Sequence, residues 1–291
     1  ASIALLAAPF IAAAQEPTAA AKKTVLITGA SSGFGRATTE RLAAKGHFVY
    51  TGARKQEDID ALNALKNVKA LRLDVALQAD IDAAVAQVAA DGRGLDGLVN
   101  NAGVAILFPL NEVDEADLKY LFDVNIWGPW RVTKAFAPML IASKGRVVNL
   151  SSISGIFAAP LLGPYSMSKH AVEAYSEALR GEMAKFGVKV AAIEPGNFGT
   201  EIGQTAYERM QARDQTYKGS PFEAAAVANM ERLRGKQGKE GPERVAKAIE
   251  HALLNPNPRP RYLVVSNQRD AEVTIRSSIN KLAQLNQGQP F

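Results

Sequence analysis

Short apolar runs alternate with longer amphipathic segments along most of the chain. The runs have the length of buried strands and are bounded by glycine and polar residues. We expect strands at residues 24–29, 47–53, 68–75, 95–103, 145–152, 188–196 and 261–265. The segments between the runs carry apolar residues at the spacing of a helix. We expect helices at residues 35–46, 56–65, 80–90, 114–142, 165–187 and 242–254.

This alternation predicts an α/β fold. Strands joined by helical crossovers form a mainly parallel sheet, because each right-handed crossover returns the chain to the same end of the sheet. Seven runs predict about seven strands, with helices on both faces in a doubly wound arrangement. Ligands of such sheets bind at the carboxyl ends of the strands. The chain shows no internal repeat, and we expect residues 24–291 to form a single domain.

The two ends of the chain lie outside this alternation. Residues 1–16 form an apolar run that resembles the end of a secretory signal and is too short to span a bilayer. A signal-like segment and a plain N-terminal arm, linked to the domain by residues up to 23, are equal alternatives. Residues 269–286 are predicted to form a helix that covers either the substrate cleft or an oligomer partner. Its partly periodic apolar residues are Val273, Ile275, Ile279, Leu282 and Leu285.

Composition narrows the class of protein. Of the 291 residues, 47% are hydrophobic and 22% are charged, which is typical of a globular protein with a sizeable core. The net charge is +5, but the basic residues are scattered, so we expect no nucleic-acid partner. The absence of cysteine excludes disulfides and thiol chemistry. His47, His170 and His251 fit no zinc-ligand spacing, so we expect no metal site and interpret them as structural.

The first strand runs directly into a glycine-rich turn, "TGASSGFG", that precedes a helix. Gly29, Gly33 and Gly35 would let the backbone approach a pyrophosphate, whose charge is favoured by the free amides of a helix N-terminus. Glycine also ends strands for purely structural reasons, but its place after the first strand favours a nucleotide site. Ser31 and Ser32 are additional candidates for phosphate donors.

The end of the second strand should meet the adenosine ribose of a dinucleotide. The sequence there is "YTGARK", with Arg54 and no carboxylate. A cation at this place suits a ribose 2′-phosphate, so NADP(H) is favoured, and Lys55 could share the contact. The alternative is an arginine that is simply solvated at the start of a loop.

Tyr165 and Lys169 lie four positions apart at the start of a predicted helix. Residues at this spacing share one helical face. The spacing alone is weak evidence, because it also arises by chance. It gains weight from three polar motifs that end neighbouring strands, namely "NNAG", "NLSS" and "PG".

These motifs together resemble the short-chain dehydrogenase/reductase family. The resemblance covers residues 24 to 200 through "TGASSGFG", "NNAG", "VN" at 124–125, "SS" at 151–152, "YSMSK" and "PGNFGT". Its details are most similar to the branch of retinol and 17-beta-hydroxysteroid dehydrogenases. The resemblance implies a Rossmann-type fold, an NAD(P)-dependent oxidoreductase, and a homodimer or homotetramer.

The resemblance also assigns catalytic roles. It makes Tyr165 the acid/base, Ser152 a second contact to the substrate oxygen, and Asn125 the residue whose backbone holds a water. Lys169 would bind the nicotinamide ribose and lower the pKa of the phenol, because a nearby cation favours phenolate. The alternatives are a core tyrosine, a surface lysine and a capping asparagine.

The cofactor contacts implied by the family extend over several strand ends. Asp74 and Val75 would meet the adenine, although an aspartate after a strand is often only a cap. Phosphate-selective members often have a basic residue where this chain has Ser32, which leaves NAD(H) open. The full predicted set is Gly29, Ser31, Ser32, Gly33, Phe34, Gly35, Arg54, Asp74, Val75, Asn101, Ala102, Gly103, Tyr165, Lys169, Pro195, Gly196 and Thr200.

Residues 199–240 correspond to a helical lid over the active site in this fold. Apolar side chains there and after Ser152 would either line a substrate pocket or pack the lid. They are Tyr207, Met210, Tyr217, Phe222, Met230, Ile156, Phe157 and Leu161. An apolar lid favours a hydrophobic ketone, aldehyde or secondary alcohol as substrate.

Two other functions share the same fold. One is a cofactor-bound sensor or scaffold without turnover, and the other is an epimerase or dehydratase of the same family. The intact set of Asn125, Ser152, Tyr165 and Lys169 favours the oxidoreductase. The supply of NADPH favours the cytoplasm, whereas residues 1–16 indicate export.

Overall fold

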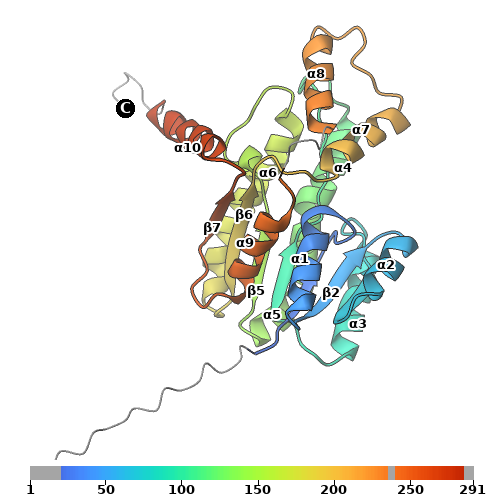
Figure 1. Ribbon diagram of the computed structural model, residues 1–291, viewed down its shortest axis with the longest axis vertical. Helices are drawn as coiled ribbons and strands as arrows, with labels where there is room; N and C mark the ends of the chain where they lie inside the picture. The colour runs from blue at the N-terminus through green and yellow to red at the C-terminus, as the bar shows by residue number, and fades with distance from the viewer. Residues whose placement is uncertain (1–20, 235–239, 285–291) are drawn as a thin grey trace, which may run out of the picture.

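A computed structural model describes residues 21–234 and 240–284. Within them the centre is a seven-stranded parallel sheet, which confirms the predicted fold class (Figure 1). The order of its strands is β3-β2-β1-β4-β5-β6-β7. The strands are β1 (Thr24–Ile27), β2 (Phe48–Ala53), β3 (Val68–Arg72), β4 (Gly97–Asn100), β5 (Arg146–Leu150), β6 (Lys189–Pro195) and β7 (Arg261–Val264).

Helices connect the strands and cover both faces of the sheet (Figure 1). The α-helices that the structure describes are α1 (Gly33–Ala44), α2 (Gln56–Asn63), α3 (Gln78–Ala90), α4 (Glu115–Phe122), α5 (Gly128–Ala142), α6 (Gly163–Ala184), α7 (Ile202–Ala212), α8 (Glu223–Arg234), α9 (Glu243–Leu254) and α10 (Gln268–Ala283). Two short turns add to them, the π-helical η1 (Asp123–Trp127) and the 3-10 turn η2 (Ile153–Gly155). The π-helical turn interrupts the helical region expected at 114–142.

Two apolar layers form the core, one on each face of the sheet. Val25 and Ile27 of β1 pack with side chains of α1, α2 and α9, and Leu26 packs on the opposite face with side chains of α3, α5 and α6. Successive residues of a strand point to opposite faces, so a parallel sheet covered on both sides requires continuous apolar strands. This is why the strands are visible as uninterrupted apolar runs in the sequence.

The order of the strands creates a crevice at the carboxyl end of β1. From β1 the chain builds outward through β2 and β3, and then returns to place β4 on the other side of β1. The loops that leave β1 and β4 therefore diverge, and ligands of such sheets bind between them. In Figure 1, α4, α7 and α8 lie beyond this end of the sheet.

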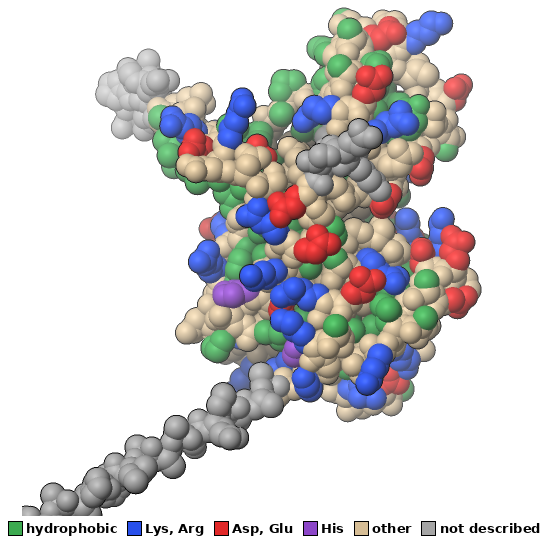
Figure 2. Space-filling model, in the orientation of Figure 1, with side chains coloured by type: hydrophobic (Ala, Val, Ile, Leu, Met, Phe, Trp, Pro, Cys, Tyr) green, Lys and Arg blue, Asp and Glu red, His purple; other side chains and the backbone are tan. Residues whose placement is uncertain are grey.

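The surface of the molecule is of mixed charge, and its last described helix is partly exposed. On the face in Figure 2, basic and acidic side chains are interspersed. No helix within the described ranges is long and apolar enough to cross a membrane. The helix α10 leaves Val273, Ile275, Ile279 and Leu282 about half exposed or more, while the expected segment 1–16 and Leu285 lie outside the described residues.

Candidate active site

A cavity of about 560 Å³ lies at the carboxyl ends of the strands. It is lined by the glycine-rich loop, by the ends of β2, β4, β5 and β6, and by α7. Sixteen of the predicted site residues line it: Gly29, Ser31, Ser32, Gly33, Phe34, Arg54, Asp74, Val75, Asn101, Ala102, Gly103, Ser152, Tyr165, Pro195, Gly196 and Thr200. Gly35, Asn125 and Lys169 are not among the residues that line it.

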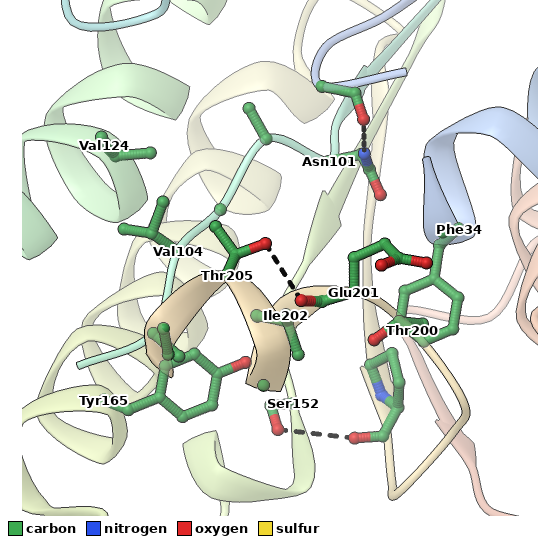
Figure 3. A pocket seen from close by; sticks show the side chains of 18 of the residues that line it. Phe34, Asn101, Val104, Val124, Ser152, Tyr165, Thr200, Glu201, Ile202 and Thr205 are labelled. Atoms are coloured by element: carbon green, nitrogen blue, oxygen red, sulfur yellow. Dashed lines mark hydrogen bonds between the residues drawn. The ribbon is translucent and has the colours of Figure 1, made fainter. Parts of the chain in front are cut away.

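The glycine-rich loop is packed tightly onto the end of β4. Gly29 has a φ of +62°, and a Cβ there would lie 2.7 Å from the Cα of Ala102. A Cβ at Gly35 would lie 2.5 Å from Nδ2 of Asn101. That amide donates to the carbonyl oxygen of Thr28, at 2.9 Å, and to that of Gly29, at 2.8 Å, and Figure 3 draws the second of these bonds. Glycine is thus required here by close approach of two loops as well as by backbone conformation.

The same loop fits the pyrophosphate of a dinucleotide. Gly33, which also has a positive φ of +54°, lines the cavity at the first residue of α1. The side chain of the N-cap residue Ser32 makes no bond to the amides of α1. Amides without a side-chain partner at a helix N-terminus favour an anionic group.

One cationic side chain, Arg54, lines the cavity after β2. Arg54 is exposed, lines the cavity and has no ion pair within residues 21–234 and 240–284. Lys55 is instead paired with Glu57 at 3.3 Å. Asp74 lines the cavity too, but its Oδ1 accepts from the amide of Ala76 at 3.0 Å, so it does form a local turn.

Tyr165 and Ser152 meet at the opposite end of the cavity (Figure 3). Burial raises the pKa of the Tyr165 phenol to about 12, and a hydrogen bond with Ser152 opposes this rise. The hydroxyl of Ser152 also accepts from the amide of Ser154 at 3.1 Å and makes a long contact, 3.4 Å, to the carbonyl of Pro195. Ser152 is thus held between β5, η2 and the end of β6.

Lys169 is buried beneath Tyr165 on the same face of α6. Its Nζ lies 5.6 Å from the centroid of the Tyr165 ring and donates to the carbonyl of Leu150 at 2.8 Å. Burial lowers the pKa of Lys169 to about 8, against the effect of Glu173, which raises it. The shared face agrees with the expected spacing, but the pKa of Tyr165 lies above its ordinary value because burial dominates.

Asn125 ties the loop after β4 to α6. It lies in the π-helical turn, where its Oδ1 accepts from the amide of Val104 at 2.9 Å. Its Nδ2 donates to the carbonyl of Val104 at 2.9 Å and to Oγ of Ser168 at 3.0 Å. Three polar partners leave the buried side chain of Asn125 satisfied, and its contacts bring together the two segments that flank Lys169.

The lid forms the outer wall of the cavity, partly through residues that the sequence reasoning missed. Ile202, Thr205 and Arg209 of α7 line the cavity, and so does Arg232 of α8. The first three recur at three- and four-residue spacing, which is the pattern of one helical face. Figure 3 shows Ile202 close to Tyr165 and Ser152.

The apolar candidates for pocket lining or lid packing have different places in the structure. Phe157 lines the cavity, whereas Phe222 is 40% exposed. The others that the lid contributes pack together in a small apolar cluster against the loop after β4. These are Tyr207, Met210, Tyr217 and Met230, joined by Leu161. Ile156 is not among the residues that line the cavity.

A buried carboxylate anchors the lid to α4. Asp117, whose side chain is 2% exposed, accepts from Nη2 of Arg209 at 2.8 Å and pairs with Nε of Arg213 at 3.3 Å. Nε2 of Gln215 donates to it at 2.6 Å. Tyr217 adds a second anchor by donating to the carbonyl of Leu107.

Comparison with known proteins relates this geometry to a family. The family model described as short chain dehydrogenase matches residues 23–211. The mitochondrial D-beta-hydroxybutyrate dehydrogenase of Mus musculus is 34% identical over 270 residues, which cover 86% of this chain and 78% of that protein. The NADPH-dependent 3-dehydrocapnine reductase of Ornithobacterium rhinotracheale is 34% identical over 250 residues, covering 82% of this chain and 87% of that protein.

A solved structure shows the same fold. A short-chain dehydrogenase/reductase from Burkholderia phymatum, in complex with NAD, superposes with a TM-score of 0.75 at 26% identity. The match covers 90% of this chain and 95% of the other. Because the family match spans every segment from the glycine-rich loop to α7, the chain belongs to the short-chain dehydrogenases and is an NAD(P)-dependent oxidoreductase.

Proposed function

We propose that this protein is an NADP(H)-dependent oxidoreductase that acts on a hydrophobic ketone, aldehyde or secondary alcohol. The observation that carries the proposal is the group of Tyr165, Ser152 and Lys169 at one end of a cavity whose other end holds the glycine-rich loop. When bound, the nicotinamide supplies or accepts the hydride. The side chains of the protein manage the proton and the substrate oxygen.

In reduction, the phenol of Tyr165 donates a proton to the substrate oxygen, while the hydroxyl of Ser152 holds that oxygen. The phenolate that results is buried, so its formation needs a cation nearby. Lys169 provides that cation one helical turn away. Asn125 bonds both to the loop after β4 and to α6, and so holds these two segments in place beside Lys169. In oxidation, Tyr165 acts as the base.

Arg54 supports NADP(H) as the preferred cofactor. It lines the cavity after β2, where a cation suits a 2′-phosphate. The relative named an NADPH-dependent reductase agrees with this preference. NAD(H) is the alternative, because a solved relative is in complex with NAD and this chain has Ser32 in its glycine-rich loop.

A specific observation favours a second substrate class. Arg232 of α8 lines the lid side of the cavity, where a guanidinium group could bind a carboxylate. A relative named a hydroxybutyrate dehydrogenase acts on a substrate of that chemistry. A 3-oxo or 3-hydroxy acid is therefore the alternative to a neutral hydrophobic substrate.

The first test is oxidation of NADPH and NADH with a panel of neutral ketones, aldehydes and 3-oxo acids. Tyr165→Phe should lower kcat by at least about 10²-fold, the range of a lost general acid, and leave NADPH binding nearly unchanged. Arg232→Met should raise KM for the acids alone if a carboxylate is the natural group.

Three outcomes separate the functions. Turnover that depends on Tyr165 supports the oxidoreductase. Tight NADPH binding without turnover of any carbonyl compound would favour a sensor or scaffold, and rearrangement of a sugar or alcohol without net oxidation would favour an epimerase or dehydratase. Light scattering on the purified protein tests the proposed homodimer or homotetramer.

A further inference from the structure

A cluster of buried charges lies behind Lys169. Glu173 is on the next turn of α6 and Glu194 is on β6, directly before Pro195. The two glutamates are 6% and 4% exposed. Neither belongs to the residues that line the cavity, and the proposed chemistry does not use them.

One arginine of β7 holds the cluster together. Nη1 of Arg261 lies 2.5 Å from Oε2 of Glu173 and 3.3 Å from Oε1 of Glu194. Its Nη2 contacts Glu177 of α6 at 3.1 Å, at the exposed edge of the cluster. One guanidinium charge thus faces three carboxyl groups, two of them buried. Burial and the charge of Glu173 raise the pKa of Glu194 well above its usual range.

A second observation also indicates that the buried pair holds a proton. Oε1 of Glu173 is buried and has no hydrogen-bond partner among the described residues. A buried carboxylate oxygen without a donor is costly, whereas a protonated carboxyl group in the pair reduces that cost. The ionisable groups that face Glu173 are Lys169 and Glu177 on α6, Glu194 on β6 and Arg261 on β7.

The cluster is in contact with the catalytic turn. A Cβ placed on Gly155 of η2 would lie 3.0 Å from Cγ of Glu173, 2.8 Å from the carbonyl oxygen of Lys169 and 2.7 Å from Oγ of Ser151. Glu173 therefore lies against the turn that carries Ser152. Glu194 is also close to the site in sequence. It directly precedes Pro195, whose carbonyl oxygen contacts the hydroxyl of Ser152.

We propose that Glu173, anchored by Arg261 and sharing a proton with Glu194, is a positioning residue that keeps Lys169 charged during the reaction. The inference rests on the proposed function. As the pH rises through neutrality the pair loses its proton, and the added negative charge favours the ammonium form of Lys169. The ammonium then persists to a higher pH than burial alone would allow, and activity persists with it.

The test is the pH profile of kcat/KM for carbonyl reduction. In Glu173→Gln the pH above which activity falls should move down by about 1 unit, because an opposite charge near the ammonium is removed. Glu194→Gln should move it in the same direction, and it replaces the first variant if Glu173→Gln does not fold. At pH 6 Lys169 is charged with or without the glutamates, so the affinity for NADPH at that pH should stay unchanged in both variants.

Glu177→Gln is the matched control. Glu177 also contacts Arg261, but its side chain is 66% exposed, so its loss should leave the profile in place. A profile that does not move in Glu173→Gln, or that moves equally in Glu177→Gln, would overturn the proposal.

Infrared spectroscopy gives a readout that does not need turnover. The wild type should show a protonated carboxyl band that disappears as the pH rises through neutrality, and Glu194→Gln should lack it. Absence of the band in the wild type would refute the shared proton. A protein with the band but without carbonyl turnover would refute the proposed function and leave the buried pair supported.

Discussion

Lys169 is an ammonium group held where water hardly reaches, 5% exposed and bonded to the backbone carbonyl of Leu150. Burial opposes its charge and Glu173 favours it, so its ionisation depends on a balance between neighbours. Tyr165 shows the same competition between burial and the hydrogen bond of Ser152. Such opposed effects are typical of active sites, because proton transfer at neutral pH needs groups moved from their ordinary pKa values.

We expect Arg54 to determine the choice between NADPH and NADH. In Arg54→Asp the ratio of kcat/KM for NADPH over NADH should fall by about 10- to 100-fold, since a charge-assisted bond to a phosphate is lost and a ribose acceptor is gained. Steady-state kinetics with both cofactors measures the ratio. Lys55→Ala is the control, because Lys55 already pairs with Glu57. An unchanged ratio in Arg54→Asp would place the phosphate elsewhere.

Sequence reasoning is strongest for residues at the carboxyl ends of strands. Asn101, Ser152 and Pro195 could be predicted to lie together because parallel strands bring their carboxyl ends to one edge. Asn125 could be named only by resemblance, since its partners Val104 and Ser168 come from separate segments. Glu173 reads as an ordinary polar helix position, because nothing local shows that Arg261 and Glu194 pack against it.

Among the helices, α7 depends on one buried acid for its position. Asp117 lies 92 residues before Arg209 in the chain, so a helical lid was predictable and its anchor was not. The π-helical turn was missed for a related reason. The hydrophobic pattern of residues 114–142 continues through it, and an extra residue in one turn leaves little trace in that pattern.

Loss of the Asp117 charge should loosen the lid. In Asp117→Asn two arginines lose a carboxylate, and we expect the free energy of unfolding to fall by about 1–3 kcal/mol. Residues 202–234 should become more sensitive to trypsin, and KM for the carbonyl substrate should rise. Denaturant unfolding and limited proteolysis measure these effects.

Asp114→Asn is the companion variant. Its side chain is 60% exposed and contacts Arg213 at 3.8 Å, so it should change stability much less. Equal losses of stability in the two variants would show that negative charge near the start of α4, rather than the buried contact of Asp117, holds α7 in place.

For the whole molecule, the buried charge of Lys169 should be visible in the dependence of stability on pH. Its pKa is about 8 in the folded protein and about 10.5 for an ordinary lysine. Between these values the unfolded chain binds more protons, so stability rises with pH in that window and the cost of burial is constant below it. The full rise is on the order of 3 kcal/mol.

Lys169→Met should remove this rise. The difference in unfolding free energy between the cofactor-free wild type and Lys169→Met should shift in favour of the wild type from pH 8 to pH 10. Chemical unfolding across that range measures it. A constant difference would mean that Lys169 loses its proton at an ordinary pH in the folded protein.

The number of strands could be predicted from the sequence, whereas the order of the strands and the packing of the lid could not. Seven apolar runs became seven strands because a sheet covered on both faces needs continuous apolar strands. The neighbours of each strand follow from how crossovers pack, which no single run records. For lid residues such as Tyr217 and Met230 the sequence left pocket lining and lid packing open, because apolar character alone does not distinguish a pocket wall from a core; in the structure they pack on the loop after β4.

The strand order also determines when each strand can find its neighbours during folding. Neighbouring strands in the described sheet are parallel, so each pairing closes a long loop that contains a helix. β1, which lies between β2 and β4 in the finished sheet, has one open side until β4 is made at residue 97. During synthesis or refolding that side is an unpaired edge that can capture another chain. Aggregation through this edge therefore competes with folding, and folding is slow compared with that of helical proteins of equal length.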